Sequence, residues 1–236
     1  MINTYVWLAM PAVVMLLGGV LTTFWHPDKN LIGLVQHLAA GIILAALMIE
    51  VFPEMRGFKV EQTVLIASFA AGVLFMYGVK LLGEHLEAGA QAQATSSRFN
   101  YGLIITVFID AALDGVTIGA GFAAGAKVGF ALALGLSVEM LFLAMSLISD
   151  TIKGTRILKL SAALSLTILI CAVAGFHALS ASSHATISIA LAFSAAALLY
   201  LVTEELLIEA HVHEEKPYAM LVLFGGFIAF WAITLI

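Results

Sequence analysis

Residues 101–148 read YGLIITVFIDAALDGVTIGAGFAAGAKVGFALALGLSVEMLFLAMSLI. The stretch holds two apolar runs, 101–124 and 128–148, with only a short glycine-containing break between them. A helix needs about 20 apolar residues to cross the hydrocarbon core of a bilayer, so each run can cross it once. The two runs predict a pair of antiparallel membrane-spanning helices joined by a tight turn.

Six further runs of similar length occupy the rest of the chain. The eight predicted spans are residues 6–24, 31–53, 63–83, 101–124, 128–148, 157–178, 186–208 and 218–236. Strands of a membrane barrel have about ten residues of alternating polarity, which these continuous runs do not show. We therefore expect an all-α integral membrane protein in which residues 1–236 form a single transmembrane domain. Only residues 84–100 are expected to form a loop of any size.

The composition also indicates a membrane protein. Of the 236 residues, 62% are hydrophobic and 11% are charged, and the mean hydropathy is +1.09. Soluble chains carry about a quarter charged residues, so an ordinary cytosolic protein is excluded. The net charge of −5 and the scattered basic residues argue against nucleic-acid binding. A single cysteine, Cys171, cannot form an internal disulfide, and no Cys/His zinc module is present.

The basic residues predict the orientation in the membrane. With the N-terminus outside, seven of the ten Lys and Arg residues fall on the cytoplasmic side, so both termini are expected outside. Those seven are Lys29, Lys80, Arg98, Lys153, Arg156, Lys159 and Lys216. The first span lacks a basic start and a small-residue cleavage site, so we expect it to remain as a membrane helix. The compact chain without targeting segments suggests the inner membrane of a bacterium as its cell membrane.

Three acidic residues lie near the middle of predicted spans, where an ionised carboxylate costs about 2.5–3.5 kcal/mol on insertion scales. Asp110 and Asp114 are four residues apart, so their side chains share one face of the fourth span. Glu139 lies at the middle of the fifth span, at the same height in the antiparallel pair, so the three acids can converge. Converging carboxylates need protons or a cation to compensate them. The simplest partner is a bound divalent cation.

Two other interpretations of polar residues stay open. The three acids could instead be protonated and hydrogen-bonded to Thr106, Thr117 or Ser137 in a packed interior. Glu50, near the outer end of the second span, could guide ions, and an acidic and imidazole cluster at the cytoplasmic end of the seventh span suits transient capture of a transition metal. A solvated helix end predicts much the same composition. The cluster includes Glu204, Glu205, Glu209, His211 and His213.

The segment DAALDGVTIG at residues 110–119 resembles the His-Asn-x-x-(Asp/Glu)-Gly-x-x-Ile-Gly motif of the ZIP family of divalent metal transporters. Glu139 matches the last acid of the family's (His/Gln)-x-x-x-Glu motif in the fifth span. The second span, with Glu50 and its Pro-Glu sequence at 53–54, and the seventh span, with EELLIEAH at 204–211, are also similar to ZIP counterparts. Eight spans and a longest loop between the third and fourth spans extend the resemblance over the whole chain.

The resemblance implies a ZIP-like bundle and a two-metal site, but several ligand positions differ. Asp110 stands where the family has histidine, and four positions carry Ala111, Gly135, Leu136 and Ile168 in place of polar residues. One metal ion per site is therefore expected. An all-oxygen set favours harder ions such as manganese or iron, although zinc also accepts carboxylates, and cobalt and cadmium stay open.

The leading hypothesis is a secondary transporter that moves a divalent metal ion across the cell membrane. The resemblance implies an elevator motion, in which spans one, four, five and six slide against the others. The alternative is a ZIP-like protein that has lost transport and acts as a metal sensor or assembly partner. No phosphate-binding loop, HExxH pair or nucleophile with a base occurs in the spans, so we expect no enzyme and no permanent cofactor. Lipid is the expected surrounding, and a homodimer is one candidate assembly.

Overall fold

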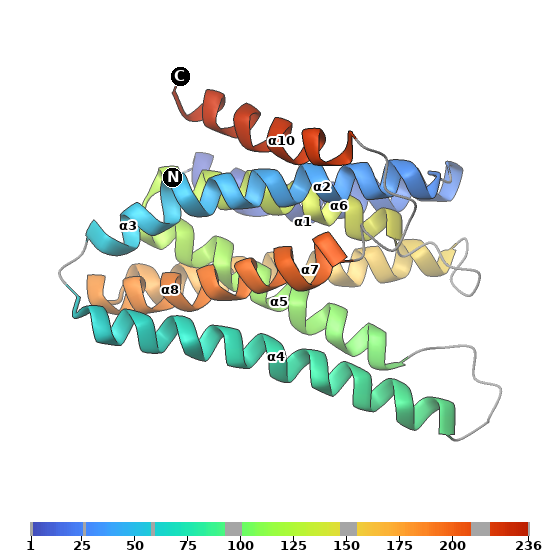
Figure 1. The fold of residues 1–236 in the computed structure, drawn as a ribbon, viewed down its shortest axis with the longest axis horizontal. Coiled ribbons are helices and arrows are strands. Elements are labelled where there is room, and N and C mark those ends of the chain that lie inside the picture. Colours follow the sequence, from blue (N-terminus) through green and yellow to red (C-terminus); the bar gives the residue numbers. More distant parts are fainter. Residues whose placement is uncertain are drawn as a thin grey trace.

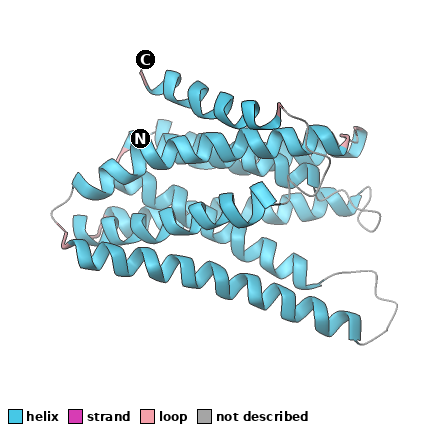
Figure 2. Ribbon diagram, viewed as in Figure 1, coloured by secondary structure: helices cyan, strands magenta, loops and turns pink. Residues whose placement is uncertain are grey.

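The structure, a computed structural model, describes residues 2–25, 27–57, 60–92, 101–146, 155–208 and 218–235. Within these ranges all regular structure is helical and no β-strand occurs (Figure 2). Seven helical segments are long and apolar enough to cross a membrane. Large apolar side chains face outward, among them Ile66 and Leu74, which are 68% and 69% exposed, as contact with lipid requires. The predicted all-α, multi-pass architecture is confirmed.

The helices pack side by side as a bundle (Figure 1). In chain order they are α1 (Ile2–Phe24), α2 (Lys29–Ala46), η1 (Leu47–Val51), α3 (Phe52–Gly57), α4 (Gln62–Ala92), α5 (Tyr101–Ala124), α6 (Ala126–Ser146), α7 (Thr155–Ser180), α8 (His184–Leu201), η2 (Val202–Leu206) and α10 (Ala219–Thr234). The segments η1 and η2 are single turns of π-helix. Both ends of the described chain lie at the same end of the bundle (Figure 1).

The two ends of the bundle differ in the elements that they carry. The hairpin end carries the turn at Gly125 between α5 and α6, the start of α4 and the start of α8. The opposite end, the Lys80 end, carries the later part of α4 and the segment η2. In Figure 1 the hairpin end is on the left.

Two predicted spans differ from the observed helices. The third predicted span ends at residue 83, but α4 continues to Ala92, so residues 84–92 of the expected loop are helical. Those residues are mostly Glu, Leu, Ala and Gln, which favour helix, and they contain no proline. The eighth predicted span covers 218–236, whereas α10 has 16 residues. A helix of that length rises about 24 Å, less than the roughly 30 Å of a hydrocarbon core.

The second predicted span, 31–53, is helical up to Gly57 but is interrupted by the π-turn η1. Pro53 follows this turn, and because proline has no N–H it cannot donate to the carbonyl four residues earlier. The Phe52 N–H bonds instead to the Leu47 oxygen, five residues back, which is the π-helical pattern. Pro53 is compatible with this turn, although η2 has the same π-helical pattern without a following proline.

The unit formed by α2 and η1 recurs as α8 and η2. Each begins after a cap whose side chain accepts a hydrogen bond from the backbone N–H three residues on, at 3.0 Å for Asp28 and 3.2 Å for Ser183. Each has 18 α-helical residues followed by five π-helical residues. The fourth residue of the π-turn is Glu50 in one unit and Glu205 in the other. The two units run in opposite directions, as in an inverted repeat.

The packing of the helices follows the same repeat. The helix α2 packs on α10 as α8 packs on α4, and α1 packs on α6 as α7 packs on α5. A Cβ placed on Gly226 would lie 2.7 Å from the Leu38 oxygen, and one placed on Gly72 would lie 2.5 Å from the Phe193 oxygen. Leu38 and Phe193 hold the same position in α2 and α8, ten residues from the start. The bundle therefore contains two inverted halves, with α5 and α6 between them.

Candidate metal centre

The pair α5 and α6 forms the middle of the bundle. The two helices are separated only by Gly125, whose N–H bonds to Gly121 O and whose carbonyl accepts from Gly129 N–H, both at 3.0 Å. A Cβ on Gly121 would lie 3.2 Å from the Cα of Gly129, so the helices approach closely beside the turn. This short, tight connection sets the heights of the side chains on the two helices relative to each other.

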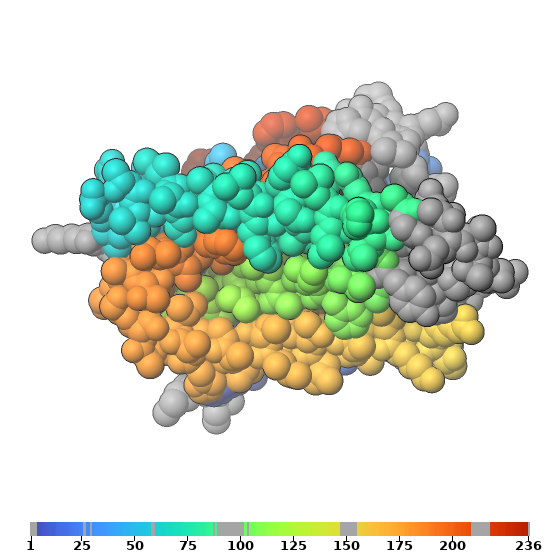
Figure 3. All heavy atoms as spheres, turned by 90° about the horizontal axis from the view of Figure 1, so that it is seen from below, coloured from blue at the N-terminus to red at the C-terminus, as the bar shows by residue number. Residues whose placement is uncertain are grey.

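The helix α5 is held equally closely on its other side. A Cβ on Gly115 would lie 2.6 Å from the Ile168 oxygen of α7, and one on Gly119 would lie 2.5 Å from the Ala172 oxygen. Figure 3 shows α5, in green, flanked by α4 in teal and by α7 in yellow-orange on one face of the molecule. The helix that carries two of the candidate acids therefore has a fixed position and rotation.

The three predicted acids come together in the interior. One carboxylate oxygen each from Asp110, Asp114 and Glu139 lies within 4.8 Å of the other two. Two oxygens bound to one ion at about 2.1 Å are at most about 4.2 Å apart, so an inward movement of under about 1 Å would close the group around a cation. The geometry fits one small divalent ion.

These carboxylates are largely buried, and some of their oxygens lack hydrogen-bond partners. Asp114 is 2% exposed and Glu139 is 4% exposed, whereas Asp110 is partly exposed. Each of the three has one buried oxygen without a hydrogen-bond partner: Oδ1 of Asp110, Oδ2 of Asp114 and Oε2 of Glu139. Buried polar atoms are nearly always satisfied in folded proteins, so an unpartnered oxygen on each of three neighbouring acids is consistent with a bound ion, water or protons.

Two of the hydroxyl groups expected to satisfy these acids donate elsewhere. Ser137 donates to the Ala133 oxygen of its own helix at 2.6 Å, and Thr106 donates to the Gly102 oxygen at 3.2 Å. Because a hydroxyl has a single proton to donate, neither of these two can donate to an ionised carboxylate at the same time. The third hydroxyl, Thr117 Oγ1, is buried without a hydrogen-bond partner one turn beyond Asp114. A protonated acid would itself donate to a hydroxyl oxygen, so protonation stays the alternative to a bound ion.

A fourth acid acts on the group from the Lys80 end. The carboxylate of Glu205, in η2, has the same sign of charge as Asp110, Asp114 and Glu139 and disfavours their ionised forms. The three acids also repel one another. A cation at their centre would reduce all of these repulsions at once, whereas protonation removes them one at a time.

The positions where ZIP ligands were expected but missing are apolar in space as well. Ala111, Leu136 and Ile168 are 0%, 1% and 0% exposed and belong to the main hydrophobic core. Gly135 packs on α2, where a Cβ would lie 3.3 Å from Ile43 Cγ1. None of these four positions offers a ligand atom, and among the described residues the three acids form the one group found that could hold an ion.

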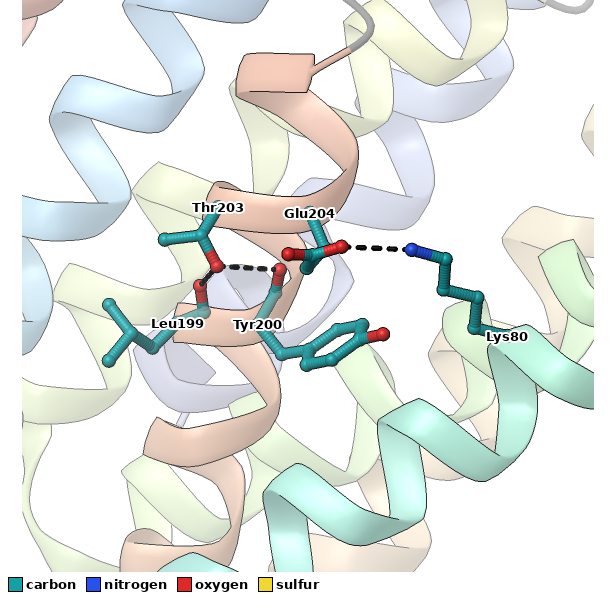
Figure 4. A network of polar contacts seen from close by, with 5 residues as sticks. All are labelled: Lys80, Leu199, Tyr200, Thr203 and Glu204. Atoms are coloured by element: carbon teal, nitrogen blue, oxygen red, sulfur yellow. Dashed lines mark hydrogen bonds and ion pairs between the residues drawn. The ribbon is translucent and has the colours of Figure 1, made fainter.

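The structure separates the peripheral candidates. Glu204 is bound to Lys80 of α4, with 2.8 Å between Nζ and Oε2 (Figure 4). Glu205 is exposed in η2, and Glu50 is partly buried in η1. Glu209, His211 and His213 lie outside the described residues. The ion pair therefore ties Glu204 to α4.

Two features of the site were not predicted. One is the π-turn under each of Glu50 and Glu205, since π-helical turns are rare and often mark functional sites. The signal in the sequence is the shared spacing of two glutamates four residues apart, at 50 and 54 and at 205 and 209, each after a long apolar run. The other is the pair of buried α7 hydroxyls, Ser161 and Ser165, whose oxygens also lack hydrogen-bond partners.

Comparison with known proteins adds no assignment. No protein-family profile and no curated protein sequence matches the chain. The functional interpretation therefore rests on the residues and their geometry.

Proposed function

We propose that this protein carries a divalent transition-metal ion across a membrane, with Asp110, Asp114 and Glu139 as ligands of the ion. The observation that carries the proposal is the group of three neighbouring carboxylates, two buried and one partly exposed, each with an oxygen that lacks a hydrogen-bond partner, between two adjacent predicted spans. An acid inside a membrane is costly to insert and typically marks an ion pathway. A permanently bound structural cation would account for the three central acids. It would not account for Glu50 and Glu205, which lie in the two π-turns.

The donor set favours hard ions. All three candidate ligands are carboxylates, and no Cys or His belongs to the group. Oxygen ligands suit manganese and iron, whereas imidazole and thiolate ligands suit zinc and copper. We therefore infer a preference for Mn²⁺ or Fe²⁺ over Zn²⁺, with Zn²⁺, Co²⁺ and Cd²⁺ as weaker substrates.

The inverted repeat supports a route through the centre. Transporters built from inverted repeats place their substrate site at the repeat interface and use interrupted helices to approach it. Here the interrupted helices carry Glu50 toward the hairpin end and Glu205 toward the Lys80 end. The distribution of basic residues favours the hairpin end outside, and in that orientation Glu50 would receive the ion from outside and Glu205 would pass it to the cytoplasm. The partial exposure of Asp110, on the Lys80 side of Asp114, supports an inward-facing arrangement.

We infer that the chain is a divergent relative of the ZIP transporters. The motif at 110–119, the inverted halves and the central α5–α6 pair support this relationship, and the apolar residues at lost ligand positions mark the divergence. An elevator motion would move α1, α5, α6 and α7 as one group against α2, α4, α8 and α10. The packing of α7 on α5, of α1 on α6 and of α1 on α7 supports the first group, whereas α2 with α10 and α4 with α8 pack as two separate pairs.

Uptake into proteoliposomes tests the proposal. We expect purified protein to accumulate Mn²⁺ or Fe²⁺ in vesicles, with weaker accumulation of Zn²⁺, Co²⁺ and Cd²⁺, measured in parallel at two pH values. Empty vesicles and vesicles holding the Asp114→Asn variant are the controls. Tight binding of these ions without accumulation would favour the sensor hypothesis, and neither binding nor accumulation would contradict a metal function.

The carboxylate group also predicts proton competition. Ligand carboxylates must be deprotonated to bind a metal, and crowding keeps some of them protonated when no ion is bound. We therefore expect the affinity for Mn²⁺ to rise from pH 5.5 to pH 7.5, by roughly tenfold per pH unit for each proton released. Calorimetry in two buffers of different ionisation enthalpy counts those protons. An affinity that does not change with pH would contradict this competition.

A further inference from the structure

Thr117, in α5, carries a buried hydroxyl that no described residue hydrogen-bonds. The residue is 1% exposed, and its Oγ1 has no donor or acceptor beside it. A hydroxyl in the interior of a helix commonly donates to the carbonyl oxygen three or four residues earlier. The buried hydroxyls of Thr22, Ser137 and Ser188 do so in this protein, at 3.0, 2.6 and 3.1 Å. Thr117 makes no such bond, so its oxygen is available to a partner from outside the chain.

Helical geometry places this hydroxyl on the face of α5 that carries two of the acids. Asp110, Asp114 and Thr117 occupy positions i, i+4 and i+7, so they form one stripe along the helix. Gly121 continues the stripe at i+11 and faces α6, since a Cβ there would lie 3.2 Å from the α6 backbone. Glu139 reaches the two acids from the same helix α6. Thr117 therefore lies one turn beyond Asp114, a rise of about 4.5 Å toward the hairpin end.

Two other buried hydroxyls without partners, Ser161 and Ser165, lie elsewhere. Both belong to α7. Ser161 packs on α1, where a Cβ placed on Gly19 would lie 2.5 Å from the Cβ of Ser161. Of these three hydroxyls, only that of Thr117 shares a helix face with the acids, so its relation to them is fixed by the helix itself.

The three acids leave the coordination of a divalent ion incomplete. Each contributes one oxygen to the group. Zinc takes four ligands in most protein sites, and manganese takes six in oxygen-rich ones, so at least one position stays open. A threonine hydroxyl has lone pairs that can bind an ion and carries no charge. It can therefore fill an open position without adding to the repulsion among the carboxylates.

We propose that the Thr117 hydroxyl is a fourth ligand of the ion, an inference that rests on the proposed transport function. Its oxygen binds the ion from the hairpin side, whereas Asp110 binds from the Lys80 side. Because a hydroxyl is a hard oxygen donor, it adds to the preference for Mn²⁺ or Fe²⁺ over softer ions. Thr117 thus contributes to selectivity as well as to affinity.

Calorimetric titration of the purified full-length protein with Mn²⁺ tests this role. Thr117→Val keeps the shape of the side chain but removes the oxygen, so we expect roughly tenfold weaker binding. Thr117→Ser keeps the hydroxyl and should bind as the parent does. Thr22→Val is the matched control, because Thr22 is equally buried and its hydroxyl donates to the Gly19 oxygen. This control should bind as the parent does, and parental affinity in Thr117→Val would overturn the proposal.

A cysteine at position 117 gives a readout that a purely structural hydroxyl would not produce. The background is Cys171→Ser, which removes the one native thiol. In it, Thr117→Cys should raise the ratio of Cd²⁺ affinity to Mn²⁺ affinity by at least about tenfold, because thiolate prefers soft ions. Cd²⁺ should also produce a sulfur-to-metal charge-transfer band in the ultraviolet. Thr22→Cys in the same background should do neither. An unchanged ratio without the band in Thr117→Cys would overturn the proposal.

The two proposals fail separately. If Asp114→Asn binds and transports Mn²⁺ as the parent does, the proposed function is wrong. If Asp114→Asn loses both but Thr117→Val and Thr117→Cys keep the parental affinities, the role of Thr117 is wrong and the proposed function stands. Should Thr117→Val fail to fold, Thr117→Cys decides by its ratio of Cd²⁺ to Mn²⁺ affinity.

Discussion

Replacing Asp114 with asparagine is expected to abolish metal uptake without unfolding the protein. Asp114 is 2% exposed, and its oxygen lies close to those of Asp110 and Glu139. Asparagine has the same shape but removes one negative charge and one strong ligand from the group. Because altering even a partner that only supports a metal ligand costs about 10- to 100-fold in affinity or activity, we expect at least a roughly 100-fold loss of initial uptake rate in proteoliposomes.

A matched control separates the loss of a ligand from the loss of a charge. Asp28→Asn makes the same chemical change at an exposed helix cap, where asparagine caps as well as aspartate does, so uptake should not change. The thermal midpoint of Asp114→Asn in metal-free buffer should stay level or rise, since an unpaired buried charge is costly. Uptake by Asp114→Asn at the parental rate would contradict the ligand role. So would a fall in its thermal midpoint large enough to unfold the variant under the uptake conditions, because unfolding would then account for the lost uptake.

Replacing Gly41 with alanine is expected to destabilise the bundle. A Cβ at this position would overlap the backbone oxygen of Leu223 in α10, and a backbone atom cannot turn aside as a side chain can. The two helices would have to separate, at a cost of about 1–3 kcal/mol, which is typical of overpacking. Thermal unfolding in detergent, followed by loss of the monodisperse peak, measures the change.

Gly33→Ala is the control for this substitution because it lies in the same helix. A Cβ at Gly33 would meet nothing within 4 Å. Since glycine weakens a helix interior by about 0.5–1 kcal/mol relative to alanine, this variant should be as stable as the parent or more stable. Equal stability of the Gly41 and Gly33 variants would mean that α10 does not pack closely on α2.

The central acids could be predicted from the sequence because local rules fix their geometry. Asp110 and Asp114 are one helical turn apart, and the break before Glu139 is too short to allow anything but an antiparallel neighbour. The helices can be predicted because the backbone N–H and C=O groups of a long apolar run have no water to bond in lipid. A helix satisfies these groups within the run itself. Gly135 and Ile168 were identified as positions without a ligand side chain by counting residues along the ZIP motifs.

The partners of the outlying residues could not be predicted in the same way. The pairing of Lys80 with Glu204 depends on α4 packing against α8, which are far apart in the chain and apolar on most faces. Helices surrounded by lipid show little difference between the buried and the exposed face, so the sequence does not indicate which helices meet. The extension of α4 to Ala92 escapes prediction because its polar residues suggest a loop, although they favour helix.

The α2–η1 and α8–η2 units have the same element lengths from cap to π-turn. Such a match is what duplication of an ancestral three-helix gene would leave, the copies inserted upside down relative to each other. If each copy adopted the conformation of the other, the central site would open to the opposite side of the membrane, at nearly the same energy. For a carrier of this design, the prevailing gradient, rather than any one-way mechanism in the architecture, would decide which compartment gains cargo.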